Sequence, residues 1–204
     1  MTVAVDRAYE WTKERLLDGT FADGELLSEG QVAQELGISR TPVREAFLRL
    51  QAESFLRLYP KRGALVVPVS LTEARELSQA RTTIEEFALR AVAHRGDAEL
   101  AELGKELTAK ADAAGSATGN ARMQAILDFH RTLVAAAGNS VVTDMYRGLS
   151  ERMLRLVAAA LNSYDPVRDA EEHRELAELV GTGQVAAAVE LLRRHITGSF
   201  GRFG

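Results

Sequence analysis

The chain has 204 residues, of which 46% are hydrophobic and 26% are charged, a composition typical of a soluble globular protein. The absence of cysteine excludes disulfides, zinc–thiolate sites and cysteine nucleophiles, and a net charge of −4 argues against non-specific coating of nucleic acid or membranes. No signal peptide is visible, and no apolar run approaches the roughly 18 residues of a membrane span. We therefore expect a cytoplasmic protein with no membrane partner.

The first part of the chain predicts three helices followed by a two-stranded hairpin. A helix at about 3–18 is followed by a short helix from Ser28, closed by Gly37, and then by a third helix. Two short β-rich runs flank the turn "PKRG". These are the parts of a winged helix-turn-helix, which we expect over residues 1–70, with a linker at Val69–Ser70.

The stretch "SRTPVREAFLRLQ" carries the strongest functional signal. Arg40 and Arg44 are four residues apart and lie on one helix face, near the end that enters the major groove in helix-turn-helix proteins. A guanidinium matches the O6/N7 edge of guanine. The alternative is a surface helix with solvated arginines. Including the N-cap and the wing, the expected DNA-binding residues are Ser39, Arg40, Thr41, Arg44, Lys61, Arg62 and Gly63.

Almost all of the chain after residue 70 has helical periodicity. Thr72 is the expected N-cap of the first of these helices, and the stretch at 111–121 has the Gly/Ser/Asn content of a loop. Further helices are predicted at about 97–111, 121–137, 140–161, 166–180 and 183–197. The expected fold class is therefore mainly α: an N-terminal winged helix-turn-helix followed by an all-helical domain over residues 71–204.

Three of the four histidines lie on three different predicted helices, each on an apolar or Ala-rich face: His130, His173 and His195. Neutral imidazoles from facing helices are a common way to build a metal site inside a bundle. Three histidines suit zinc, nickel, manganese or iron. The alternative is that each is a half-buried, hydrogen-bonded histidine. The fourth, His94, is expected at the surface or at a helix end.

The segment "LLSEGQVAQELGISRTPVREAFLRLQAESFLRLYPKRGALVVPVS" resembles the DNA-binding domain of the GntR family of bacterial transcriptional regulators. The resemblance implies that Arg40, Thr41 and Arg44 contact operator DNA and that Gly63 lies at the wing tip. Residues 72–198 resemble the FCD effector domain of the FadR-type subfamily, through "ARTTIEEFALRAVA", "DFHRTLVAAAGN" and "EEHRELAELVGTGQVAAAVELLRRHI".

In many FCD domains an aspartate and three histidines bind a divalent metal, and this resemblance implies the ligands His130, His173 and His195. The family aspartate lies four residues before the first histidine, where this chain has Ile126. Asp128 lies about 200° around the helix from His130 and is expected to point elsewhere. The fourth position would then hold water, an effector or Asp169.

Arg81 is the expected effector-binding residue, because a guanidinium grips a carboxylate in bidentate fashion. The alternative for this arginine is a helix-surface pair with Glu85, four residues on.

The expected function is that of a DNA-binding repressor rather than an enzyme, controlled by an organic or sugar acid. We expect a homodimer, because one winged helix reads only a half-site of the operator DNA. Two alternatives are a regulator in which the metal ion itself is the signal, and a three-histidine metalloenzyme. The sequence contains no H-E-x-x-H motif that would support the enzyme.

Overall fold

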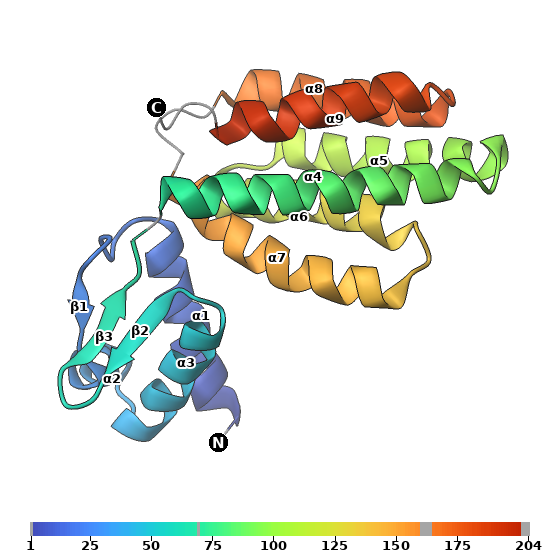
Figure 1. The fold of residues 1–204 in the computed structure, drawn as a ribbon. Coiled ribbons are helices and arrows are strands. Elements are labelled where there is room, and N and C mark those ends of the chain that lie inside the picture. Colours follow the sequence, from blue (N-terminus) through green and yellow to red (C-terminus); the bar gives the residue numbers. More distant parts are fainter. Residues whose placement is uncertain (1, 69, 160–164, 201–204) are drawn as a thin grey trace. The chain divides into compact units, whose positions relative to one another are not determined.

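The computed structural model describes residues 2–68, 70–159 and 165–200. By contacts the chain divides into two compact units, Met1–Ser70 and Leu71–Gly204 (Figure 1). Across the described ranges, none of the helices combines the length and apolarity needed to cross a bilayer.

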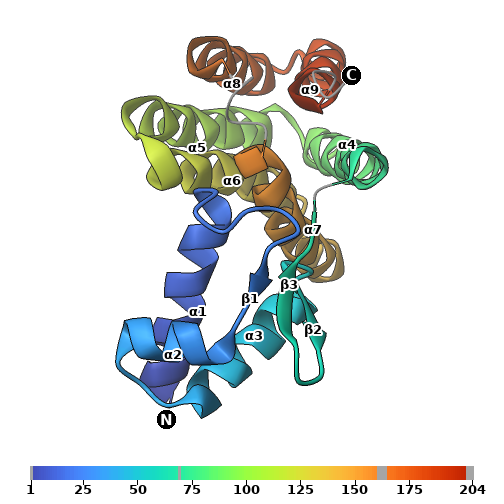
Figure 2. The same ribbon diagram turned by 90° about the vertical axis from the view of Figure 1, so that its left-hand side faces the viewer.

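The first unit contains three helices and a small antiparallel sheet with the strand order β1-β3-β2 (Figure 2). Its elements are α1 (Thr2–Leu17), β1 (Leu26–Leu27), α2 (Glu29–Leu36), α3 (Arg40–Ala52), β2 (Leu56–Tyr59) and β3 (Gly63–Val66). The expectation of only two strands was wrong, because β1 also pairs with β3, with Leu26 opposite Leu65 and Leu27 opposite Ala64. A strand of two residues is too short to show alternation in the sequence.

Local signals determine the ends of α2. Ser28 is its N-cap, and the Ser28 side chain accepts a hydrogen bond from the Gly30 backbone N–H. Gly37 has φ 64° and ψ 36°, the left-handed conformation that glycine adopts without steric cost, and it turns the chain toward α3. Ser39 stands at the N-cap position of α3, although within the described chain its side chain makes no capping hydrogen bond.

The second unit is entirely helical in its described residues (Figure 1). Its helices are α4 (Leu71–Ala93), α5 (Asp97–Ser116), α6 (Gly119–Ala135), α7 (Ser140–Ala159), α8 (Pro166–Gly181) and α9 (Val185–Phe200). Seen nearly end-on, α8 and α9 lie on one side of the unit and α6 and α7 on the other (Figure 2). The core is filled by α4, α5, α6, α8 and α9, for example by Leu89, Leu107, Phe129, Leu176 and Leu192.

Two boundary predictions in this unit were wrong. The loop expected at 111–121 is helical up to Ser116, because Ala111 and Ala114 are buried and their packing outweighs the weak helix propensity of the nearby Gly and Ser. Thr72 is not an N-cap, since α4 already begins at Leu71. The last residues of the helix expected at 140–161 lie outside the described residues.

Candidate nucleic-acid interface and metal centre

Helix α3 presents one polar face and buries the other. Arg40, Thr41 and Arg44 are all exposed in its first two turns. The opposite face is fully buried through Val43, Ala46, Phe47 and Leu50, each 0% exposed. Because this apolar face fixes the helix in the unit, the exposed arginines are held on a rigid support suitable for contact with a DNA groove.

The wing places two basic side chains at the turn between β2 and β3. Lys61 and Arg62 are both exposed, and the Arg62 backbone N–H donates to the Tyr59 carbonyl at 3.0 Å. Gly63 follows this turn as the first residue of β3, opposite Tyr59. A Cβ on Gly63 would lie 2.3 Å from the carbonyl oxygen of Leu27, and its φ is 109°. Close packing against β1 therefore requires glycine here, whether or not DNA approaches it.

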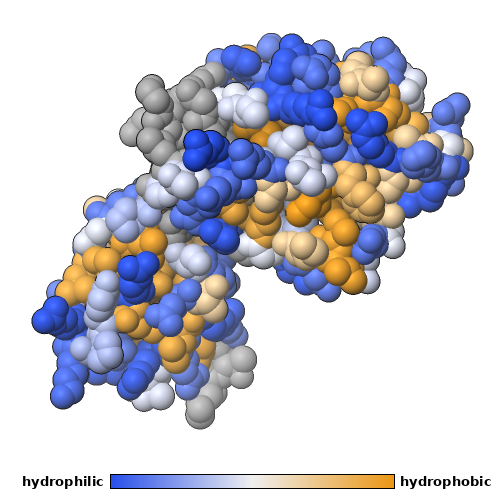
Figure 3. Space-filling view, viewed as in Figure 1, coloured by the Kyte–Doolittle hydropathy of each residue, from blue (hydrophilic) through white to orange (hydrophobic). Residues whose placement is uncertain are grey.

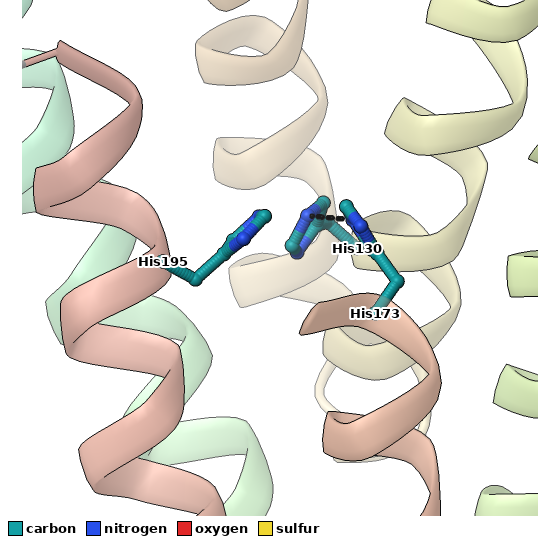
Figure 4. Close-up of side chains that lie close together, drawn as sticks. All are labelled: His130, His173 and His195. Atoms are coloured by element: carbon teal, nitrogen blue, oxygen red, sulfur yellow. Dashed lines mark hydrogen bonds between the residues drawn. The ribbon is translucent and has the colours of Figure 1, made fainter. Parts of the chain in front are cut away.

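The three histidines converge in the interior of the second unit (Figure 4). His130 lies on α6, His173 on α8 and His195 on α9, and their exposed fractions are 1%, 1% and 5%. One ligating nitrogen from each ring lies within 4.8 Å of the others. The closest approach is between the Nε2 atoms of His130 and His173, at 3.0 Å. The sequence separation of these residues gave no indication of this distance.

The outward-facing nitrogen of each ring has its own acceptor. His130 Nδ1 lies 2.8 Å from Glu85 Oε2, and His195 Nδ1 lies 2.9 Å from Glu172 Oε2. His173 Nδ1 lies 2.7 Å from the backbone oxygen of Asp169. Because carboxylate and carbonyl oxygens only accept, each Nδ1 donates its proton, and the Nε2 of a neutral ring keeps its lone pair. This outer-layer pattern is typical of metal-binding histidines.

The electrostatics keep the His130 and His195 imidazoles neutral. Burial, reinforced by the nearby Arg81 guanidinium, lowers the pKa of His130 to about 3. Burial and the neighbouring His173 ring also lower the pKa of His195. Two unprotonated Nε2 atoms 3.0 Å apart would repel each other, so either a proton, as in a hydrogen bond, or a metal ion belongs between them. Bonds of about 2.0–2.1 Å to a tetrahedral zinc would separate ligand nitrogens by roughly 3.3 Å, so the residues fit a metal ion.

A buried carboxylate connects this cluster to two further helices. Glu85 on α4 is 0% exposed, and its Oε1 accepts from Arg81 Nε at 2.6 Å and from the Tyr146 hydroxyl at 2.5 Å. Burial opposes ionisation of Glu85, but the His130 and Arg81 contacts outweigh it and lower the pKa of the carboxyl. The pKa of Tyr146 is raised well above its usual value by burial and by the adjacent Glu85.

Arg81 is buried, with 5% exposure, so the alternative of a surface pair with Glu85 was wrong: the ion pair exists but lies in the interior. Of the three guanidinium nitrogens of Arg81, Nε donates a hydrogen bond to Glu85. Among the described residues, the buried Arg81 Nη2 has no hydrogen-bond partner. A buried donor without an acceptor costs free energy, so this atom is a candidate contact for a bound anion.

No carboxylate joins the three histidines as a fourth ligand within the described residues. The carboxylate of Asp169 lies 3.3 Å from Nδ1 of His173, the nitrogen opposite the one that faces His130. Asp128 pairs with Arg131 at 3.6 Å, and Ile126 is buried.

Sequence reasoning missed three parts of this site: Tyr146, Glu172 and the role of Glu85 as the partner of His130. Glu172 adjoins His173 but binds His195, and Tyr146 is 61 residues from Glu85. The four-residue spacing of Arg81 and Glu85 was the one feature of the sequence that pointed to any of these contacts. His94, by contrast, is exposed beyond the end of α4, as expected.

A winged helix with an exposed basic recognition helix, followed by a separate helical domain, defines a DNA-binding transcription regulator. Residues 4–66 match the family model of bacterial regulatory proteins, gntR family, and residues 76–198 match that of the FCD domain. The chain therefore belongs to the GntR family and carries an FCD domain. This is a family of regulatory proteins, not of enzymes.

Named relatives agree with this assignment. The Nta operon transcriptional regulator of Aminobacter aminovorans is 30% identical over 65% of this chain, which spans 63% of that protein. The probable D-xylose utilization operon transcriptional repressor of Paenarthrobacter nicotinovorans is 26% identical over 96% of this chain and 86% of its own length. The solved structure of McbR/YncC from E. coli has the same fold, with a TM-score of 0.68, 23% identity and coverage of 98% and 99%.

Proposed function

We propose that this protein is a homodimeric transcriptional repressor whose operator affinity is controlled by a small carboxylate bound beside a metal in the FCD domain. The observation that supports the proposal is the buried site itself: three imidazoles whose ligand nitrogens lie within 4.8 Å of one another, next to an arginine with a buried donor that has no partner among the described residues. The site lies in the second unit of this chain, which matches the FCD domain and does not carry the recognition helix.

For DNA binding, the exposed face of α3 supplies the reading groups. The proposed contacts are Ser39, Arg40, Thr41 and Arg44 on the helix and Lys61, Arg62 and Gly63 on the wing. An arginine near the N-terminus of a recognition helix is suited to a guanine edge, and wing lysines and arginines are suited to phosphates. One such unit reads a half-site, so two copies are needed for a palindromic operator.

For metal binding, the proposed ligands are the second nitrogens of His130, His173 and His195. Zinc, nickel, manganese or iron accept such a set. The metal would supply a localised positive charge that attracts an anionic effector. The three imidazole rings are oriented for metal binding by the acceptors of their Nδ1 atoms, which are Glu85, Asp169 and Glu172.

For the effector, Arg81 limits the chemical class. Its Nε is engaged by Glu85, and Nη2 remains as a donor for an anion. We therefore propose an organic or sugar acid. The sugar-utilization operon in the name of the P. nicotinovorans relative supports a carbohydrate-derived ligand.

The decisive experiment combines elemental analysis with DNA binding. Purified wild-type protein should contain close to one divalent metal ion per chain, and His173→Ala should contain none. His94→Ala is the matched control, because His94 is exposed and outside the cluster. Wild-type protein that contains no metal and takes up none on addition of zinc would refute the metal site. Failure to select any preferred DNA sequence would refute the repressor.

A second candidate function, a regulator that senses the metal itself, is supported by the three-histidine cluster, which offers ligands to an ion without any organic effector. Measuring operator affinity as zinc is added distinguishes the metal-sensing regulator from the regulator that responds to an organic acid. If zinc alone changes the affinity, the ion is the signal; if only an added organic acid does so, the ion is a permanent part of the effector site.

A further inference from the structure

Leu48 is a large apolar side chain on the exposed side of α3. It is 50% exposed, whereas the apolar side chains that fix α3 in the unit are fully buried. Exposed apolar groups also occur elsewhere in the first unit, where Figure 3 shows hydrophobic and hydrophilic side chains next to one another. Exposure alone therefore does not indicate a role for Leu48, but its position around the helix axis does.

Helix geometry places Leu48 within the face that carries the expected DNA-binding residues. Successive residues of an α-helix are rotated by about 100°, so Arg44 lies about 40° around the axis from Arg40, and Thr41 about 100°. Leu48, eight residues after Arg40, lies at about 80°, between the directions of Arg44 and Thr41. The buried side chains of α3 lie between about 240° and 340° on the same scale. Leu48 therefore shares one exposed face with the three polar residues.

This face ends near Leu48, because the next side chain along it is engaged by the unit itself. Gln51 lies at about 20° on the same scale, and its Oε1 accepts a hydrogen bond from the Leu58 backbone N–H of β2 at 2.8 Å. Leu48 is one turn beyond Arg44, about 6 Å along the axis at 1.5 Å per residue. At about 3.4 Å per base pair, this is a distance of roughly two base pairs. A helix that places Arg44 in the major groove therefore brings Leu48 to the base edges of a neighbouring pair.

We propose that Leu48 is a further specificity-determining residue of α3, and that it contacts the C5-methyl group of a thymine in the major groove of the operator. The inference rests on the proposed repressor function. Of the four DNA bases, thymine alone presents a methyl group in the major groove, and apolar side chains contact it. A leucine side chain has no donor or acceptor, so at the polar edge of a G·C pair it would displace water without replacing its hydrogen bonds. Leu48 thus favours an A·T pair beside the base that Arg44 reads.

The test uses the full chain and the DNA sequence that it selects from a random pool. Each thymine of one half-site is replaced in turn by deoxyuridine, which has hydrogen in place of the C5-methyl group. At one thymine the wild-type protein should bind about fourfold more weakly after the replacement, the loss expected when one apolar carbon is removed from a dry contact. At this position Leu48→Ala should bind both DNAs equally, whereas Leu48→Met, which keeps a long apolar side chain, should retain the difference.

Leu26→Ala is the matched control. Leu26 is also 50% exposed but lies on β1, away from the face of α3, so its variant should distinguish thymine from deoxyuridine as the wild type does. If the wild type tolerates deoxyuridine at every position, or if the difference persists in Leu48→Ala, the role of Leu48 is overturned. A chain that selects no DNA sequence would contradict the repressor function itself, and the role of Leu48 with it.

Discussion

Replacing Glu85 by Gln removes the negative charge at the centre of the buried network while keeping the shape of the side chain. The carboxylate accepts from Arg81, Tyr146 and His130. The amide of a glutamine at this position would have only one acceptor oxygen, and its N–H groups would face side chains that are themselves donors. The Arg81 guanidinium, only 5% exposed, would then remain charged in the interior without its counter-ion.

The expected cost is large, because breaking a buried ion pair by neutralising one partner leaves an uncompensated charge and typically costs about 3–5 kcal/mol. For a domain of this size we expect Glu85→Gln to lower the free energy of unfolding of the second unit by that amount. Urea denaturation monitored by circular dichroism, at one fixed protein concentration, measures it.

The matched control is Asp112→Asn, which breaks the ion pair of Asp112 with Arg174. Those side chains are 61% and 51% exposed, and exposed pairs contribute about 0–1 kcal/mol. A Glu85→Gln loss of the same size as the control would refute the reasoning, because the network would then contribute no more than a surface pair.

Three further predictions concern DNA binding, pH and the wing. Arg44→Ala should weaken specific operator binding by roughly 1–3 kcal/mol and relax the base preference, whereas equal weakening on all sequences would identify a phosphate contact. The pKa of His130 in the folded protein is about 3, below the usual 6.5. Between these two pH values the unfolded chain binds more protons than the folded chain, so the stability falls as the pH decreases below 6.5. After the metal has been removed with a chelator, the protein should therefore have a lower Tm near pH 5 than near pH 7.5. Both pH values lie above the range in which Glu85 titrates, and equal Tm values would contradict a buried neutral imidazole at His130. Gly63→Ala should destabilise the first unit by about 2 kcal/mol or more, because its Cβ would meet the Leu27 oxygen, while Gly19→Ala, at φ 78° in open space, should cost about 1 kcal/mol. Equal losses in these two variants would show that the close contact with β1 is unimportant.

Features that depend on neighbours in the chain were predictable. Ser28 and Gly37 bound α2 in the structure as the capping pattern predicted, because a cap and a left-handed turn involve only adjacent residues. Strand β1 was missed and α5 was cut short, because β1 exists only through pairing with β3, and the end of α5 is stabilised by burial of Ala111 and Ala114.

By itself, the sequence determined the family, the order of the helices and the three candidate histidines, since these follow from short motifs and helical periodicity. Only the tertiary structure decided how the histidines are used. It placed Glu85 and Glu172 on their outer nitrogens, buried the ion pair of Arg81 and brought Tyr146 to Glu85 across 61 residues. The physical reason is that packing between distant helices sets these contacts and their burial, and neither leaves a periodic signal in the chain.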